Sequence, residues 1–194
     1  MKRLLGLTVA FLLITSLAGA ADDKSTPLYP LKENNKWIYK VSSGTVEVKV
    51  VKKEKFADEE CYKLETSAQG KVTTTEHVVV REDGVYRLGI NGVKVEPAIK
   101  FLALPPTKNF KWEIKSKVDK QDIEGYFQIK EEDVTVPAGP YKASTLVDTN
   151  NFKVAGKDST VKAWFVKDVG IVKLTFSLEG QEATFELEKF EAGK

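Results

Sequence analysis

The chain has 194 residues and carries 30 Lys and Arg against 28 Asp and Glu, so its formal net charge is only +2. This balance argues against a phosphate-binding surface for nucleic acid and gives no steering toward anionic membranes. A single Cys excludes an internal disulfide, and a single His argues against a His-rich metal site and leaves at most one catalytic triad.

The first 20 residues have the pattern of a secretory signal peptide. Lys2 and Arg3 precede an apolar run over Leu4–Leu17 that is too short to span a bilayer, and Ala18–Ala20 is a small-residue cleavage site. The alternative is an uncleaved N-terminal anchor. We expect export to the periplasm or the extracellular space after cleavage near Ala20, with no transmembrane segment in the mature chain.

Residues 21–194 are expected to form one β domain, because apolar and polar residues alternate with a period of two almost throughout. The alternation begins at Trp37 and continues through Val46–Val50 and Tyr62–Thr66. Further along, Asp83-Gly84 and Asn91-Gly92 are hairpin signals, since both allow the positive φ of tight turns.

The stretch Phe101–Leu104 is apolar without alternation, which fits a buried strand or a short helical turn. Alternation resumes at Trp112 and at Ile123–Ile129. Pro137–Pro140 predicts a rigid corner, after which strand patterns return and persist to Leu187.

No segment carries a helical stripe long enough to predict a covering helix. Roughly ten strands must therefore cover their own apolar faces, since this burial is the main favourable term in folding. The predicted fold is all-β, an antiparallel meander curled into a sandwich or a partly closed barrel. An incomplete curl would leave a lipophilic hollow.

Two stretches resemble each other and suggest an internal repeat. Pro30–Lys40 and Pro105–Lys115 share Pro, Asn, Lys and Trp at a spacing of 75 residues. Tyr62 and Tyr141 continue the correspondence at a spacing of 79. We therefore expect two related halves, 30–100 and 105–190, with chance similarity between β-rich segments as the alternative.

Three motifs resemble a family of uncharacterised exported β-rich bacterial proteins that contain a domain of unknown function. They are the strand entry Asn35–Tyr39, the corner Val134–Tyr141, and the hairpin Trp164–Lys173, in which Asp168 replaces the usual Gly. The resemblance implies an extracytoplasmic β-fold without an established activity. The curled sheet is also similar in architecture to the lipoprotein-carrier fold of the bacterial envelope, and function does not follow from such a likeness.

Motifs for catalysis and metal binding are missing from the sequence. There is no Gly-x-Ser-x-Gly, P-loop or dinucleotide fingerprint. The acidic clusters 58–60 and 131–133 offer oxygen ligands but lack the spacing and Gly of a calcium loop, so we interpret them as solvated turns. We interpret His77 as an ordinary strand residue and Cys61 as a small buried hydrophobe. No catalytic residue, metal site or cofactor is predicted, and the protein is not expected to be an enzyme.

The function that the sequence favours is a binding or carrier-type β module for an apolar small molecule or lipid. One alternative is an interaction module that binds an envelope protein through a sheet edge or the Pro137–Pro140 corner, and another is a carboxylate-based hydrolase. The candidate ligand-binding residues are Trp37, Tyr39, Trp112 and Trp164, which could line an apolar pocket. The interpretation that we favour over this one is that they belong to the core, because large aromatic residues dominate core energetics.

The strand pattern makes a stability prediction for Trp112. Trp112→Ala should lower the free energy of unfolding by about 3–5 kcal/mol, as for large aromatic side chains removed from a core. Urea denaturation of the mature protein would measure this. A loss below about 1 kcal/mol would indicate an exposed indole and move Trp112 toward a binding role.

Overall fold

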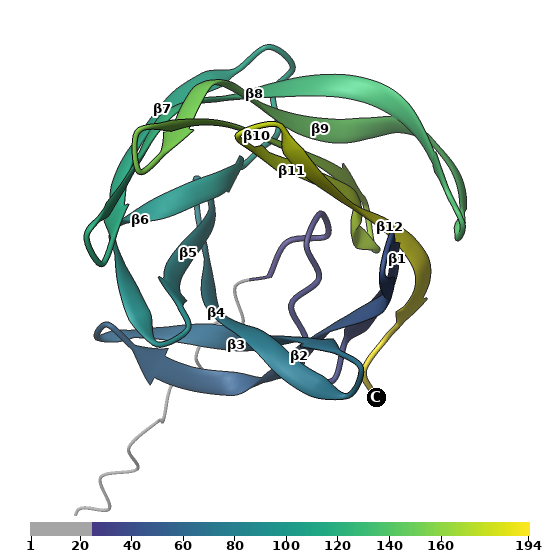
Figure 1. Cartoon of the computed structure of the whole chain (residues 1–194). Coiled ribbons are helices and arrows are strands. Elements are labelled where there is room, and N and C mark those ends of the chain that lie inside the picture. The colour runs from purple at the N-terminus through teal and green to yellow at the C-terminus, as the bar shows by residue number, and fades with distance from the viewer. Residues whose placement is uncertain (1–24) are drawn as a thin grey trace, which may run out of the picture.

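Twelve antiparallel strands follow one another around a closed barrel in the computed structural model, which describes residues 25–194 (Figure 1). The predicted all-β antiparallel fold is confirmed. Of the two predicted shapes the barrel is the correct one, and its closure is complete because β1 pairs with β12. The predicted signal peptide and the cleavage site near Ala20 lie outside the described residues.

The strands are long, and most neighbours are joined by short turns. Their bounds are β1 (Lys36–Val41), β2 (Gly44–Phe56), β3 (Glu59–Ala68), β4 (Lys71–Arg81), β5 (Gly84–Ile90), β6 (Val93–Ala103), β7 (Lys111–Val118), β8 (Gln121–Val136), β9 (Gly139–Val154), β10 (Lys157–Val166), β11 (Gly170–Leu178) and β12 (Gln181–Glu191). The predicted Asn91-Gly92 turn joins β5 to β6, with positive φ at both residues. Phe101–Ala103 proves to be the end of strand β6.

The segment of residues 25–35, which precedes β1, lies inside the ring of strands (Figure 1). Tyr29 and Leu31 in this segment are buried. The backbone carbonyl of Pro27 accepts a hydrogen bond from the Asp168 N–H at 2.7 Å. The side chain of Asn35 accepts one from the Gly193 N–H at 2.7 Å. We call residues 25–35 the N-terminal plug, because they occupy part of the barrel interior and are hydrogen-bonded to its wall.

Trp37 connects the plug to the barrel wall. It is fully buried and stacks on Phe190 of β12, with ring centroids 5.3 Å apart. The ring of Tyr29 lies 5.6 Å away on the plug side. The indole N–H donates a 2.6 Å hydrogen bond to the Val169 carbonyl in the turn before β11. The Trp37 side chain therefore links the first strand, β1, to the last strand, β12, and to the turn before β11.

The seam between β6 and β7 has few backbone pairs. Only Val95↔Val118 and Glu96↔Lys117 are in register there. Further along the seam the half-buried Trp112 of β7 donates its indole N–H to the Lys100 carbonyl of β6 at 2.9 Å. This side-chain hydrogen bond takes the place of some of the backbone hydrogen bonds that the seam lacks.

The chain forms the same turn before β1 and before β7. The Asn34 N–H donates to the Val50 carbonyl at 2.9 Å, and the Asn109 N–H donates to the Ile129 carbonyl at 2.8 Å. Both asparagines have the left-handed backbone, with φ of 68° and 67°. On this pattern we propose that β1–β6 and β7–β12 are structural repeats, at the spacing that the sequence suggested.

A small apolar cluster lies on the outer face of β3–β5, formed by Cys61, Val79 and Leu88. Beside it, Phe56 stacks on His77, with centroids 3.9 Å apart. The His77 ring nitrogen Nε2 lies 2.8 Å from a Glu54 carboxylate oxygen. Burial raises the pKa of the Cys61 thiol to about 11, so the thiol stays protonated at neutral pH.

The plug should contribute to stability through Leu31, which is 1% exposed. Leu31→Ala is expected to lower the free energy of unfolding by about 2–5 kcal/mol, because it leaves a cavity inside the barrel. Val72→Ala, at a residue 53% exposed, is the control and should change stability by no more than about 0.5 kcal/mol. Urea denaturation measures both. Equal effects would show that the plug does not pack in solution as it does here.

Candidate ligand cavity

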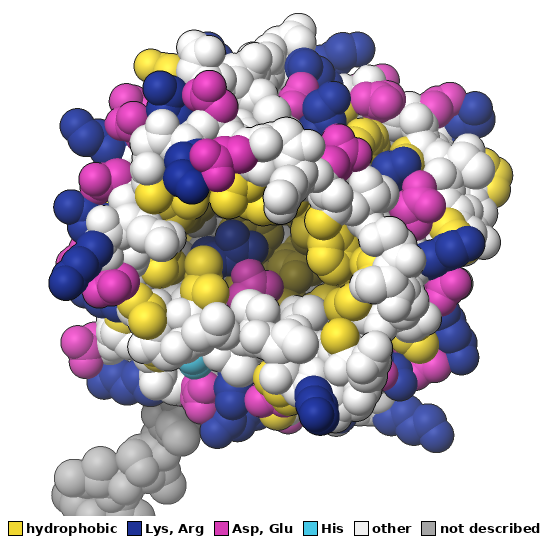
Figure 2. Space-filling view, viewed as in Figure 1, with side chains coloured by type: hydrophobic (Ala, Val, Ile, Leu, Met, Phe, Trp, Pro, Cys, Tyr) yellow, Lys and Arg dark blue, Asp and Glu magenta, His cyan; other side chains and the backbone are white. Residues whose placement is uncertain are grey.

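The barrel encloses a cavity of about 440 Å³, between the plug and the strands. Figure 2 looks into this hollow, where hydrophobic side chains surround one acidic and one basic group. The volume lies in the range of roughly 300–1,000 Å³ that is typical of small-molecule sites. The lining is mostly apolar and consists of Tyr29, Tyr39, Val48, Thr66, Thr74, Glu76, Val78, Arg87, Ile90, Ile99, Phe101, Ile123, Phe127, Val147, Thr149, Phe152, Val154, Val161, Ala163, Phe165, Ile171, Leu174, Phe176 and Phe185.

The period of two in each strand selects these residues, since alternate side chains point to opposite faces of a sheet. On β10 the lining residues are Val161, Ala163 and Phe165, whereas Lys162 is exposed. The apolar side chains at every second position therefore form the wall of the cavity.

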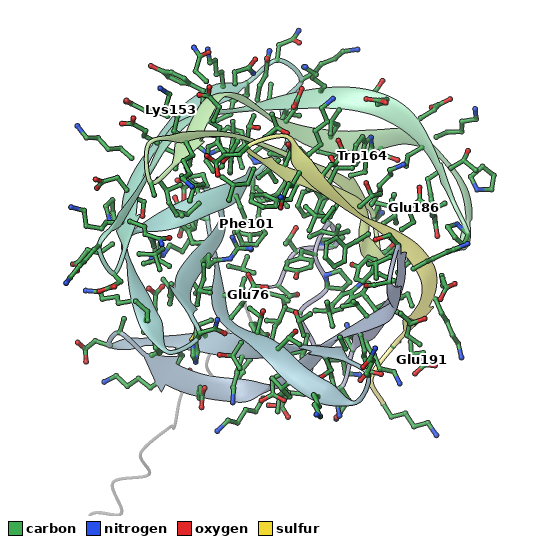
Figure 3. All side chains as sticks on the ribbon, viewed as in Figure 1. Glu76, Phe101, Lys153, Trp164, Glu186 and Glu191 are labelled. Carbon is green, nitrogen blue, oxygen red and sulfur yellow. The ribbon has the colours of Figure 1, made fainter. Side chains whose placement is uncertain are left out.

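Glu76 and Arg87 are the charged residues of the lining within residues 25–194. They come from the neighbouring strands β4 and β5, and Arg87 Nε lies 2.5 Å from a Glu76 carboxylate oxygen. Figure 3 shows Glu76 and Phe101 within the ring of strands. The guanidinium of Arg87 also lies over the Phe101 ring, 5.3 Å from its centroid, which is a cation–π contact.

Two phenols border the cavity. The Tyr39 hydroxyl donates a 2.8 Å hydrogen bond to the Ile171 carbonyl. The Tyr29 ring lies edge-on to Phe101 and Phe165, with centroids 5.9 and 6.2 Å away. Burial raises the pKa of both phenols well above the usual value, and the Glu76 carboxylate adds to the rise. Both tyrosines are therefore neutral over the physiological range.

The structure places the four predicted site residues in different surroundings. Tyr39 lines the cavity. Trp37 lies between the plug and β12, and Trp112 bridges the β6–β7 seam. Trp164 is buried on β10, with Lys173 Nζ 5.8 Å from its ring. The three tryptophans are not among the residues that line the cavity.

Neither Glu76 nor Arg87 was predicted from the sequence as a site residue. The sequence does hold a signal for both. Glu76 occupies the same face of its strand as Val78 and Val80, and Arg87 occupies the same face as Val85, because these residues are two positions apart. A charged residue in register with an apolar face is unusual unless it is paired. That exception to the alternation marks the polar spot inside the barrel.

The predicted acidic clusters lie away from the cavity. Asp58 is exposed in the turn between β2 and β3. Asp133 is exposed on β8 and pairs with Lys142 at 2.6 Å. Within residues 25–194 no group of three or more His, Cys, Asp or Glu side chains is arranged to hold a metal ion. In the same part of the chain, no helix has the length and apolar character to cross a membrane.

Comparison with known proteins finds similarity in solved structures alone. No family model and no curated protein matches the chain in sequence. A protein of Parabacteroides distasonis ATCC 8503, provisionally assigned as a lipoprotein, is 13% identical with a TM-score of 0.48. A provisionally assigned exported protein of Bacteroides fragilis NCTC 9343 with a YmcC-like fold is 12% identical with a TM-score of 0.47. Each likeness covers 87% of this chain and all of the other.

Because their pKa values are raised, the phenols of Tyr29 and Tyr39 should lose their protons at a higher pH than an exposed tyrosine does. Tyr29 and Tyr39 should ionise only as the barrel unfolds, because their folded-state pKa values lie above the ordinary value of about 10. Their contribution to stability is complete below about pH 10 and is lost as the pH rises toward the raised values. Tyrosinate absorbance, followed together with circular dichroism, measures this. The double variant Tyr29→Phe, Tyr39→Phe should lack the late component, and early ionisation of every phenol in the folded wild type would contradict the burial.

Proposed function

We propose that this protein is an exported binding or carrier protein that holds an apolar or lipid ligand inside its barrel. The observation that carries the proposal is the 440 Å³ cavity, with its largely apolar lining and, among residues 25–194, one pair of charged side chains. Such a combination of apolar surface and few polar groups is typical of ligand sites.

An acyl chain suits this cavity energetically. Each CH₂ group removed from water contributes about 0.8 kcal/mol, and several are needed to offset an association cost of at least about 4 kcal/mol. The aromatic and branched side chains on β8–β12, such as Phe127, Phe152 and Phe176, provide the apolar contacts. Affinity should therefore rise with chain length until the cavity is full.

Export and the absence of catalysis are also parts of the proposal. Export is supported by the signal-peptide pattern of residues 1–20 and by the resemblance of three motifs to an exported family. Binding is favoured over catalysis because Glu76 and Arg87 neutralise each other inside an apolar lining. A glycosidase-type hydrolase would need a second carboxylate, and a threonine or tyrosine nucleophile would need a free base beside it; among residues 25–194 the lining offers neither, because its one carboxylate is paired with Arg87.

The alternative role in an envelope assembly relied on a free sheet edge or on the Pro137–Pro140 corner. Each of the twelve strands has a partner on both sides, and where β6 and β7 share few backbone pairs the Trp112 side chain bonds across the seam, so no full strand edge is left open. The corner is the turn of the β8–β9 hairpin, and its Ala138 N–H donates to the Leu187 carbonyl of β12 at 2.8 Å. The corner thus packs against the barrel, so we favour the carrier role.

A matched pair of threonines tests the location of the ligand. Thr74 lines the cavity, whereas the adjacent Thr75 does not. Thr74→Phe should fill part of the cavity and abolish binding of a long-chain lipid, and Thr75→Phe should leave it intact. Native mass spectrometry would show the bound lipid on the mature wild type. At a ligand concentration of about 100 Kd the melting temperature of the wild type should rise by roughly 5–10 °C.

If gently purified protein carries no added mass, and added lipid shifts the melting temperature of neither the wild type nor Thr75→Phe, the barrel is not a lipid carrier. If Thr74→Phe binds as well as Thr75→Phe does, the ligand lies elsewhere on the molecule.

A further inference from the structure

We propose that the cavity selects neutral amphiphiles, with a head group that both donates and accepts hydrogen bonds, over fatty-acid anions. A fatty amide and a monoacylglycerol are the model ligands. The inference rests on the proposed carrier function and adds the chemical class of the ligand head.

The cavity has a polar side and an apolar side. Glu76, Arg87, Thr66 and Thr74 come from the neighbouring strands β3, β4 and β5, and Thr66 is the register partner of Thr74. The lining residues contributed by β10–β12 are all apolar. An amphiphile bound here would place its head against β3–β5 and its chain against β10–β12.

The net charge of the lining is zero. Glu76 and Arg87 are its charged side chains within the described residues, and they form an ion pair. An anionic head would gain attraction from Arg87 and an opposing repulsion from Glu76, because the two groups are adjacent. It would still lose its hydration, for which the site offers no net compensation. The ion pair therefore disfavours a carboxylate.

A neutral head can use both partners. The guanidinium of Arg87 donates five N–H groups in total, and Glu76 only accepts. Arg87 Nε lies close to Glu76, but its N–H is buried and makes no well-directed hydrogen bond within the described residues. Buried donors normally have a partner. A ligand carbonyl could accept from Arg87 while its own amide or hydroxyl group donates to Glu76, and hydrogen bonds to charged groups are stronger than neutral ones.

The test compares ligands that share one chain and differ in the head. Palmitamide, monopalmitoylglycerol, palmitate and hexadecanesulfonate would each displace an environment-sensitive apolar dye from the mature protein. The sulfonate stays anionic at every pH and so controls for protonation of palmitate. The wild type should bind the two neutral ligands at least about tenfold more tightly than the two anions.

Glu76→Gln is the decisive variant, because it leaves Arg87 as the one charge among the described residues of the lining. It should tighten binding of both anions by about tenfold or more and so reverse or abolish the preference. The matched control is Glu59→Gln, which changes charge equally at the Glu59–Arg81 pair, a pair outside the cavity lining. This control should keep the wild-type preference.

Arg87→Gln provides a second arm should Glu76→Gln fold poorly, as judged by circular dichroism and thermal melting. It makes the lining negative and should weaken the anions further while neutral ligands change by only a few fold. If no ligand displaces the dye, the carrier function itself fails. If the ligands bind but the wild type prefers an anion, or if Glu76→Gln and Glu59→Gln show the same preference, the head-group inference alone is overturned.

Discussion

The pairing of β1 with β12 is the contact on which the rest of the structure depends. It joins Lys36–Lys40 to Glu186–Glu191 and closes the meander into a ring. Because residues 25–194 contain no helix, this ring is the main means of covering the apolar faces of the strands. Trp37 reinforces the junction, because it contacts β12, the plug and the turn before β11 together.

The cavity is a consequence of the number of strands. The diameter of a barrel grows with strand number, and about eight strands already give an interior that side chains can fill. Twelve strands leave space, and the N-terminal plug takes up only part of it. The remaining space is lined by the side chains that point inward from each strand, and these are mostly apolar. The alternation that specifies the strands therefore also produces an apolar hollow. Glu76 and Arg87 then supply a local polar spot on one side of it.

Much of the fold could be predicted, because its signals are local. Alternation around Tyr62 and Phe127 identifies strands, and Asn91-Gly92 identifies a hairpin from the conformational demands of its turn. Closure could not be predicted, since it depends on the register of β1 against β12 across the whole length of the chain. The burial of Cys61 is also non-local, because Leu88 and Phe56 cover it on the outer face.

The site was harder to predict than the fold. Alternation shows which face a side chain takes, but not how far along the barrel it lies. Trp37 and Tyr39 share a face of β1, yet Tyr39 borders the cavity and Trp37 packs against the plug and β12. Glu76 could have been found, because it breaks the apolar pattern set by Val78 and Val80. Its pairing with Arg87 needed the three-dimensional structure.

The central claim is that an apolar ligand occupies the interior of the barrel. The most direct measurement is anomalous diffraction from crystals grown with a fatty amide that carries bromine at the end of its chain. We expect bromine density inside the ring of strands, within contact distance of Phe127, Phe152 or Phe176. Bromine found only on the outer surface, with the cavity unchanged, would contradict it.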